Sequence, residues 1–188
     1  MGSGTPSWEE WLPLVAPSRD GDRAAQQRLF ELFQPGLYHY MLRLSRDPNR
    51  AADLTQEAFV RAFLSLSTLR EDRALRGWLY RLARNLFRDA YARKTEVHGQ
   101  EATLLATADE APGPAAQLEQ TELRAAVLRA VDNLPRAQRE VIELYHLQGL
   151  DLAETAQALG LREGTVKSRL ARGRATLRRH LTPFVENG

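Results

Sequence analysis

The stretch LAETAQALGLREGTVKSRLARGRATLRR, residues Leu152–Arg179, decides the fold of the second half of this chain. Asp151, immediately before it, and Glu154 have the spacing of a capping box, which predicts that a helix begins here. Gly160 then interrupts the apolar periodicity and supplies a turn, after which a second periodic run follows. The stretch therefore predicts two helices joined by a tight turn.

The second of these helices has one apolar side and one basic side. Val166 and Leu170 are expected to pack against the first helix. This orientation matches the recognition helix of a helix-turn-helix motif, whose outer side meets base edges and phosphates, although an αα-hairpin with a solvated basic face has the same pattern. The side chains that this packing turns outward are Thr165, Lys167, Ser168, Arg169 and Arg172.

Charge is distributed unevenly along the chain. The 188 residues carry a formal net charge of only +2. From Arg70 to Lys94, however, eight basic residues face three acidic ones, and from Arg162 to His180 seven face one. Two basic stripes on an acidic background are the pattern expected of a protein that contacts a polyanion at two places.

Several function classes lack their sequence signals. The chain has no cysteine, and its four histidines lie far apart without metal-ligand spacing. Glycine-rich phosphate loops and a Ser/His/Asp signature are also missing, so we expect no enzyme, no metal and no cofactor. No apolar run approaches eighteen residues and no secretory leader begins the chain, which favours a cytoplasmic protein without membrane insertion.

The fold class expected from these patterns is all-α, with two small helical domains joined by a flexible acidic linker. Residues 22–94 show helical periodicity throughout and form the first domain. Residues 95–122 contain six acids, no Lys or Arg and the breaker PGP, and are expected to form the linker, with short helical pieces at its ends. Residues 123–182 form the second domain. Residues 1–21 are an N-terminal extension whose Trp8 and Trp11 are expected in the core, the alternative being a regulator that binds them.

Two further segments carry distinctive side chains. The helix GWLYRLARNLFRDAYARK is expected to bury a strict i+4 stripe of Trp78, Leu82, Leu86 and Ala90. Basic and aromatic side chains on its remaining surface suit single-stranded nucleic acid, whereas aromatic packing in the core is the plainer explanation; the polar members are Arg81, Arg84, Asn85 and Arg88. In DLTQEAF, the polar face formed by Asp53, Gln56 and Glu57 is by pattern alone a solvated helix surface.

Taken together, these motifs resemble the extracytoplasmic-function group of bacterial sigma factors, group IV of the sigma-70 family. The resemblance extends over about residues 23–94 and 123–181. It is carried, in order, by AADLTQEAFVRAF, by GWLYRLARNLFRDAYARK and by LPRAQREVIELYHLQG continuing into the opening stretch. Each motif alone is moderately specific, and the ordered set is highly specific.

The resemblance implies roles for the residues of the first domain. Asp53, Gln56 and Glu57 match the face that binds the coiled coil of the largest RNA polymerase subunit. The loop from Ser67 to Arg76 and the helix that follows match the elements that capture the unpaired non-template strand of the minus-ten element. Its implied DNA-binding residues are Arg76, Trp78, Arg81, Arg84, Asn85 and Arg88.

For the second domain, the resemblance implies that Lys167, Ser168 and Arg172 read the minus-thirty-five element in the major groove. It also implies that the linker passes through polymerase channels and that an anti-sigma factor binds the protein. The implied function is a promoter-specificity factor for core RNA polymerase that binds promoter DNA as duplex and as single strand. The rival is a helix-turn-helix regulator that binds duplex DNA without polymerase.

Overall fold

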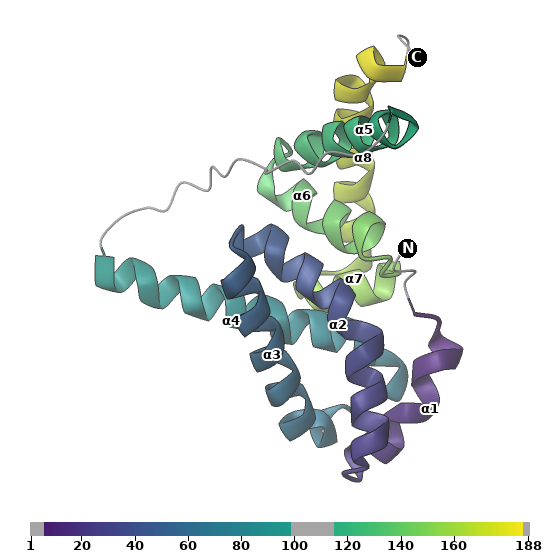
Figure 1. Cartoon of the computed structure of the whole chain (residues 1–188), viewed down its shortest axis with the longest axis vertical. Coiled ribbons are helices and arrows are strands. Elements are labelled where there is room, and N and C mark those ends of the chain that lie inside the picture. Colours follow the sequence, from purple (N-terminus) through teal and green to yellow (C-terminus); the bar gives the residue numbers. More distant parts are fainter. Residues whose placement is uncertain (1–5, 99–114, 186–188) are drawn as a thin grey trace.

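The computed structural model describes residues 6–98 and 115–185, and within these ranges it contains helices and no strand (Figure 1). This agrees with the all-α fold class. The elements are α1 (Trp8–Arg19), α2 (Arg23–Ser45), α3 (Pro48–Ser65), η1 (Leu66–Thr68), η2 (Asp72–Ala74), α4 (Leu75–His98), α5 (Ala115–Asp132), α6 (Arg136–Ile142), η3 (Glu143–Leu147, a π-helical turn), α7 (Leu152–Leu159) and α8 (Glu163–Val185).

The N-terminal unit consists of α1 to α4, and aspartates begin two of its helices. Asp22 accepts hydrogen bonds from the backbone N–H groups of Ala24 and Ala25, and Asp47 caps α3 in the same way. Pro35 lies inside α2, which continues through it without ending. Of the two N-terminal tryptophans, Trp11 is buried against Phe33, as expected, whereas Trp8 is 57% exposed.

The buried face of α4 differs from the prediction. The buried side chains of α4 include Leu75, Leu79, Tyr80, Ala83 and Leu86, while Ala90 is exposed and Trp78 only half-buried. Four residues advance a helix by about 40° more than one full turn, so a strict i+4 stripe drifts off the core within three steps. The row of Leu75, Leu79, Ala83 and Leu86 advances by four, four and three residues and therefore stays on one face, which Tyr80 widens on one side.

The C-terminal unit consists of α5 to α8 and contains the predicted helix-turn-helix. Both halves of the Asp151–Glu154 capping box form, and Gly160 ends α7 in the left-handed conformation at φ 67°. Val166 and Leu170 are buried, as predicted. The local sequence signals of this motif therefore placed its two helices and its turn correctly.

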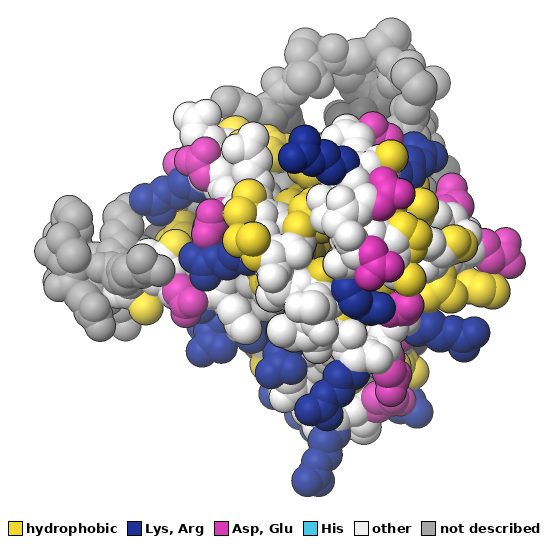
Figure 2. Space-filling view, turned by 90° about the horizontal axis from the view of Figure 1, so that it is seen from below, with side chains coloured by type: hydrophobic (Ala, Val, Ile, Leu, Met, Phe, Trp, Pro, Cys, Tyr) yellow, Lys and Arg dark blue, Asp and Glu magenta, His cyan; other side chains and the backbone are white. Residues whose placement is uncertain are grey.

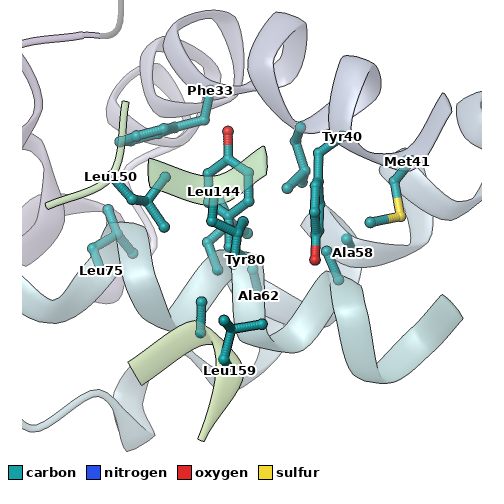
Figure 3. Packing of buried hydrophobic residues seen from close by; sticks show 14 of the residues in the cluster. Phe33, Tyr40, Met41, Ala58, Ala62, Leu75, Tyr80, Leu144, Leu150 and Leu159 are labelled. Carbon is teal, nitrogen blue, oxygen red and sulfur yellow. The ribbon is translucent and has the colours of Figure 1, made fainter. Parts of the chain in front are cut away.

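The two units pack directly on each other, with α4 lying against α7. Their apolar side chains form one continuous cluster: Tyr40 and Tyr80 of the N-terminal unit lie beside Leu144, Leu150 and Leu159 of the C-terminal unit (Figure 3). Helix α4 extends to His98 and α5 begins at Ala115, so both enter the segment expected as linker. Residues 99–114, its middle part, lie outside the described residues.

Candidate polymerase and nucleic-acid interfaces

One face of α3 is exposed along its whole length. Asp53, Gln56 and Glu57 all point to solvent, while Ala58 and Phe59 turn inward. Two apolar side chains, Val60 at 53% and Leu64 at 81% exposure, continue the same face toward the C-terminal end of the helix. We did not single these two out from the sequence, although their helical spacing from Asp53 and Glu57 would have placed them there.

The outer side of α4 carries a second exposed row. Arg81, Asn85 and Arg88 are exposed at i, i+4 and i+7, and half-buried Trp78 precedes them by one turn. Seen from below, the surface of the molecule has Lys and Arg side chains that protrude between acidic and hydrophobic ones (Figure 2). Four of the six residues implied in minus-ten binding therefore share one helical surface.

The other two, Arg76 and Arg84, lie in the contact between the units. Arg76 donates from Nε to Glu154 Oε1 at 2.8 Å and from Nη2 to the Gly149 carbonyl oxygen at 3.0 Å, and its Nη2 also forms an ion pair with Glu154. Arg84 donates to Glu140 Oε2 at 3.1 Å. Each of these side chains is 16% exposed or less. In this arrangement carboxylates of the C-terminal unit occupy two guanidinium groups expected to bind DNA.

A cleft separates the loop before α4 from the N-terminal half of α7. Its volume is about 580 Å³, and it is lined by Arg70, Arg73 and Trp78 on one side and by Asp151, Glu154 and Gln157 on the other. The N-terminal unit thus contributes two basic groups, an aromatic ring and the Glu71 carboxylate to the cleft, and the C-terminal unit contributes acidic and amide groups.

Helix α8 presents the predicted recognition residues at its N-terminal end. Lys167, Ser168 and Arg172 are exposed, and Thr165 and Arg169 are half-buried. The Ser168 hydroxyl donates to the Thr165 carbonyl oxygen at 3.0 Å, within the helix. The basic groups on this surface are thus available to a ligand, in contrast to Arg76 and Arg84.

A buried charge cluster also links the units, and the sequence analysis did not predict it. Arg43 of α2 donates to Glu143 at 3.1 Å and to Asp132 at 2.8 Å. Glu143 is 2% exposed, and burial raises the pKa of its carboxyl group against the opposing effect of the Arg43 charge. A lone acid inside the apolar run VIELYHL signals a buried carboxylate, but nothing local identifies a partner 100 residues away.

We expect this carboxylate to make the stability depend on pH. Because the pKa of Glu143 is raised, the folded protein retains a proton that the unfolded chain releases above about pH 4.5. The contribution of this proton to the free energy of unfolding is fully present below that pH. It is lost as the pH rises through the higher folded-state pKa, by about 1.4 kcal/mol for each pH unit between the unfolded-state and folded-state pKa. Urea unfolding from pH 4.5 to 7 should show the wild type losing stability relative to Glu143→Gln. Parallel pH profiles would contradict this.

Among the described residues, no group of three or more His, Cys, Asp or Glu side chains is arranged to hold a metal ion. Within the same ranges, no helix has the length and apolarity that crossing a membrane requires.

Comparisons with known proteins identify two sigma-70 regions in this chain. The Sigma-70 region 2 family model matches residues 29–97, and the Sigma-70 region 4 model matches residues 124–177. The chain is 36% identical over 167 residues to the ECF RNA polymerase sigma factor EcfG of Rhodopseudomonas palustris, a match that covers 88% of this chain and 86% of the relative. It is 31% identical over 172 residues to the ECF RNA polymerase sigma factor SigW of Bacillus subtilis, covering 87% and 92%.

Two solved structures have a similar fold. CnrH in complex with the cytosolic domain of CnrY gives a TM-score of 0.66 at 27% identity, covering 92% of this chain and 97% of the other. The sigma factor RpoE in complex with the anti-sigma factor NepR from Bartonella quintana gives 0.66 at 25% identity, covering 83% and 96%. With both sigma-70 regions present in order and close relatives matched over most of their length, this chain belongs to the extracytoplasmic-function group of sigma-70 factors.

Proposed function

We infer that this chain is a promoter-specificity factor that binds core bacterial RNA polymerase, recognises minus-thirty-five and minus-ten elements, and promotes strand opening. The observation that carries this function is the placement of three exposed residue sets on three helices: an acidic and apolar face on α3, a basic face on α4 and a basic recognition surface on α8. We assign residues 22–94 to sigma domain two and residues 123–182 to sigma domain four.

Polymerase binding is assigned to α3. Its exposed face combines Asp53, Gln56 and Glu57 with the apolar side chains of Val60 and Leu64. A helical partner with basic and apolar side chains can match such a stripe, since the apolar part is buried on binding and the charges set the register. We propose the coiled coil of the largest polymerase subunit as this partner.

Minus-ten recognition is assigned to the loop before α4 and to the outer face of α4. Arg81 and Arg88 supply positive charge that follows a nucleic-acid backbone, and Trp78 supplies an aromatic face. Extruding a base from the duplex costs a few kcal/mol, which stacking and phosphate contacts offset. Strand opening then requires no nucleotide hydrolysis, and the function includes no catalytic residue of this chain.

Minus-thirty-five recognition is assigned to α8, where Lys167, Ser168 and Arg172 are exposed on the side away from α7. An arginine bound to a guanine edge through two hydrogen bonds discriminates against other bases by about 1–3 kcal/mol. The factor acts in the cytoplasm, where polymerase and DNA are found. One structural neighbour is a sigma factor solved with an anti-sigma factor, and the other, CnrH, was solved with the cytosolic domain of CnrY. We propose an anti-sigma partner for this chain too.

Transcription in vitro tests this function directly. Core bacterial RNA polymerase is combined with a pool of genomic promoters, with and without the protein. We expect protein-dependent transcripts from a discrete promoter set. Asp53→Ala should lower polymerase binding, and Arg172→Ala should lower transcription by about 5- to 150-fold, the factor that corresponds to 1–3 kcal/mol.

Matched variants control for lost charge alone. Glu31 is an exposed acid on α2, and Arg178 is an exposed base on α8 two turns beyond Arg172. Glu31→Ala and Arg178→Ala should retain most of the activity. No transcripts from the wild type, together with tight specific duplex binding by the protein alone, would refute the proposed function in favour of a helix-turn-helix regulator.

A further inference from the structure

Helix α1 contacts the loop that precedes α4, the loop to which we assign minus-ten capture. The Arg19 guanidinium forms an ion pair with Asp72, and its Nη2 lies 3.5 Å from the carbonyl oxygen of Leu69. The Arg19 side chain is 28% exposed, so this contact is partly shielded from water. A second contact places the Arg73 guanidinium carbon 5.8 Å from the centre of the Trp8 ring.

The loop has little structure of its own to hold it. Between α3 and α4 it forms two short 3₁₀ turns. The first is closed by a backbone hydrogen bond from Leu69 N–H to Leu66, and the second by bonds from Ala74 N–H to Glu71 and from Leu75 N–H to Asp72. Leu66 and Leu69 are buried, whereas Glu71 is exposed. The path of the loop after Leu69 therefore depends on contacts from outside it. Arg19 contacts Leu69 and Asp72, which lie on either side of Arg70 and Glu71.

Helix α1 is itself firmly attached. Trp11 and Val15 are buried, and the Trp11 and Phe33 rings meet edge to face at 5.9 Å. Gln26 of α2 donates to the carbonyl oxygen of Ser18, at the C-terminal end of α1 and next to Arg19. A side chain that extends from this point is anchored on a fixed helix, and it can hold a loop in one conformation.

We propose that α1 holds the minus-ten loop in its binding conformation and that Arg19, acting through Asp72, is a positioning residue for base capture. This rests on the proposed function. Arg70 and Arg73 of the same loop line the cleft beside Trp78, so a shift of the loop displaces the groups that would meet an unpaired base. Losing the Arg19 contact should therefore affect recognition of the minus-ten element and leave the α8 surface unchanged.

The test uses holoenzyme on a promoter from the transcription experiment and on versions with single-base changes in either element. We expect Arg19→Ala to reduce discrimination at minus-ten positions about fivefold, the factor for about 1 kcal/mol from a partly exposed ion pair. Discrimination at minus-thirty-five positions and polymerase affinity should stay at the wild-type level. Asp72→Ala should have the same effect, the double variant no additional one, and Arg19→Lys should restore most of the discrimination.

Hydrogen exchange gives a readout that does not depend on promoters. The amides of Leu69 and Ala74 should exchange faster in Arg19→Ala, while amides of α2 keep their rates. Arg28→Ala, which breaks an exposed ion pair with Glu31 inside α2, is the matched control and should change neither readout.

Unchanged minus-ten discrimination in Arg19→Ala would overturn the inference, as would an equal loss at both elements, which indicates general destabilisation. Failure of the proposed function gives a different result. In that case the wild-type protein itself yields no transcripts, and the inference is refuted together with the function.

Discussion

Replacing Gly77 by alanine is expected to separate the two helical units while each stays folded. A Cβ atom at this position would lie 2.9 Å from the carbonyl oxygen of Glu154, closer than real Cβ atoms approach, and 3.0 Å from the Glu154 Cα, which is tighter than most real Cβ contacts. The obstacle is the backbone of α7, which a rotamer change cannot move. Alanine also favours the helix by about 1 kcal/mol relative to glycine, so α4 itself is not weakened. The strain is therefore relieved by separation of α4 from α7.

Small-angle scattering measures this separation. A compact chain of this length has a radius of gyration of about 16 Å, and the value for Gly77→Ala should be clearly larger. Overpacking of about 1–3 kcal/mol shifts the equilibrium between packed and separated units by about 5- to 150-fold. The control is Gly173→Ala, whose Cβ would meet the Ile142 side chain at 2.9 Å within the C-terminal unit. This variant should lose stability without separation of the units.

Separation has a consequence for nucleic-acid binding by the protein alone. Arg76 and Arg84 now pair with Glu154 and Glu140, and they become available only when the units part. Gly77→Ala should therefore bind a single-stranded minus-ten oligonucleotide more tightly than the wild type. Glu154→Gln should act in the same direction, because it removes the charge opposite Arg76 and retains the amide oxygen for the capping box. An unchanged radius and unchanged affinity in Gly77→Ala would refute both expectations.

Sequence reasoning succeeded where the determining contacts are local. The capping box at Asp151, the turn at Gly160 and the outward face of α8 each depend on residues within one or two helical turns. The first two were predicted correctly, and of the five residues predicted to face outward on α8, three are exposed and Thr165 and Arg169 are half-buried. The exposed face of α3 was predicted for the same reason. Periodicity also identified α4 as a helix, but the strict i+4 stripe was the wrong face, because which face is buried depends on the neighbours that pack against it.

The contacts between the two units could not be predicted from the sequence. Arg76 and Glu154 are 78 residues apart, and Arg84 and Glu140 are 56 apart. An arginine expected at a DNA surface is chemically equally suited to a buried carboxylate, since the guanidinium group matches either anion. Only the packing of α4 on the C-terminal unit decides between them, and its contact with α7 depends on Gly77, whose missing side chain leaves no periodic signal.

Removing the Arg43 side chain should produce the largest loss of stability among the charge contacts. In Arg43→Met the Glu143 carboxylate, 2% exposed, loses its partner and stays close to Asp132. Leaving a buried charge without its counter-ion costs about 3–5 kcal/mol. Because Arg43 belongs to the N-terminal unit and both acids to the C-terminal unit, the loss is limited to the free energy at which the units part and water reaches Glu143. Urea unfolding measures the loss of stability, and small-angle scattering shows whether the units part.

A double-mutant cycle separates the stranded charge from the lost packing. Glu143→Leu removes the buried carboxylate, and in Arg43→Met with Glu143→Leu two apolar side chains replace the ion pair. Such replacements are often neutral or stabilising, so the double variant should regain most of what Arg43→Met alone loses. The coupling should then be at least about 2 kcal/mol. Additive losses, or a cost below about 1 kcal/mol for Arg43→Met, would show that Glu143 is hydrated or protonated in the variant and that this ion pair contributes little to holding the units together.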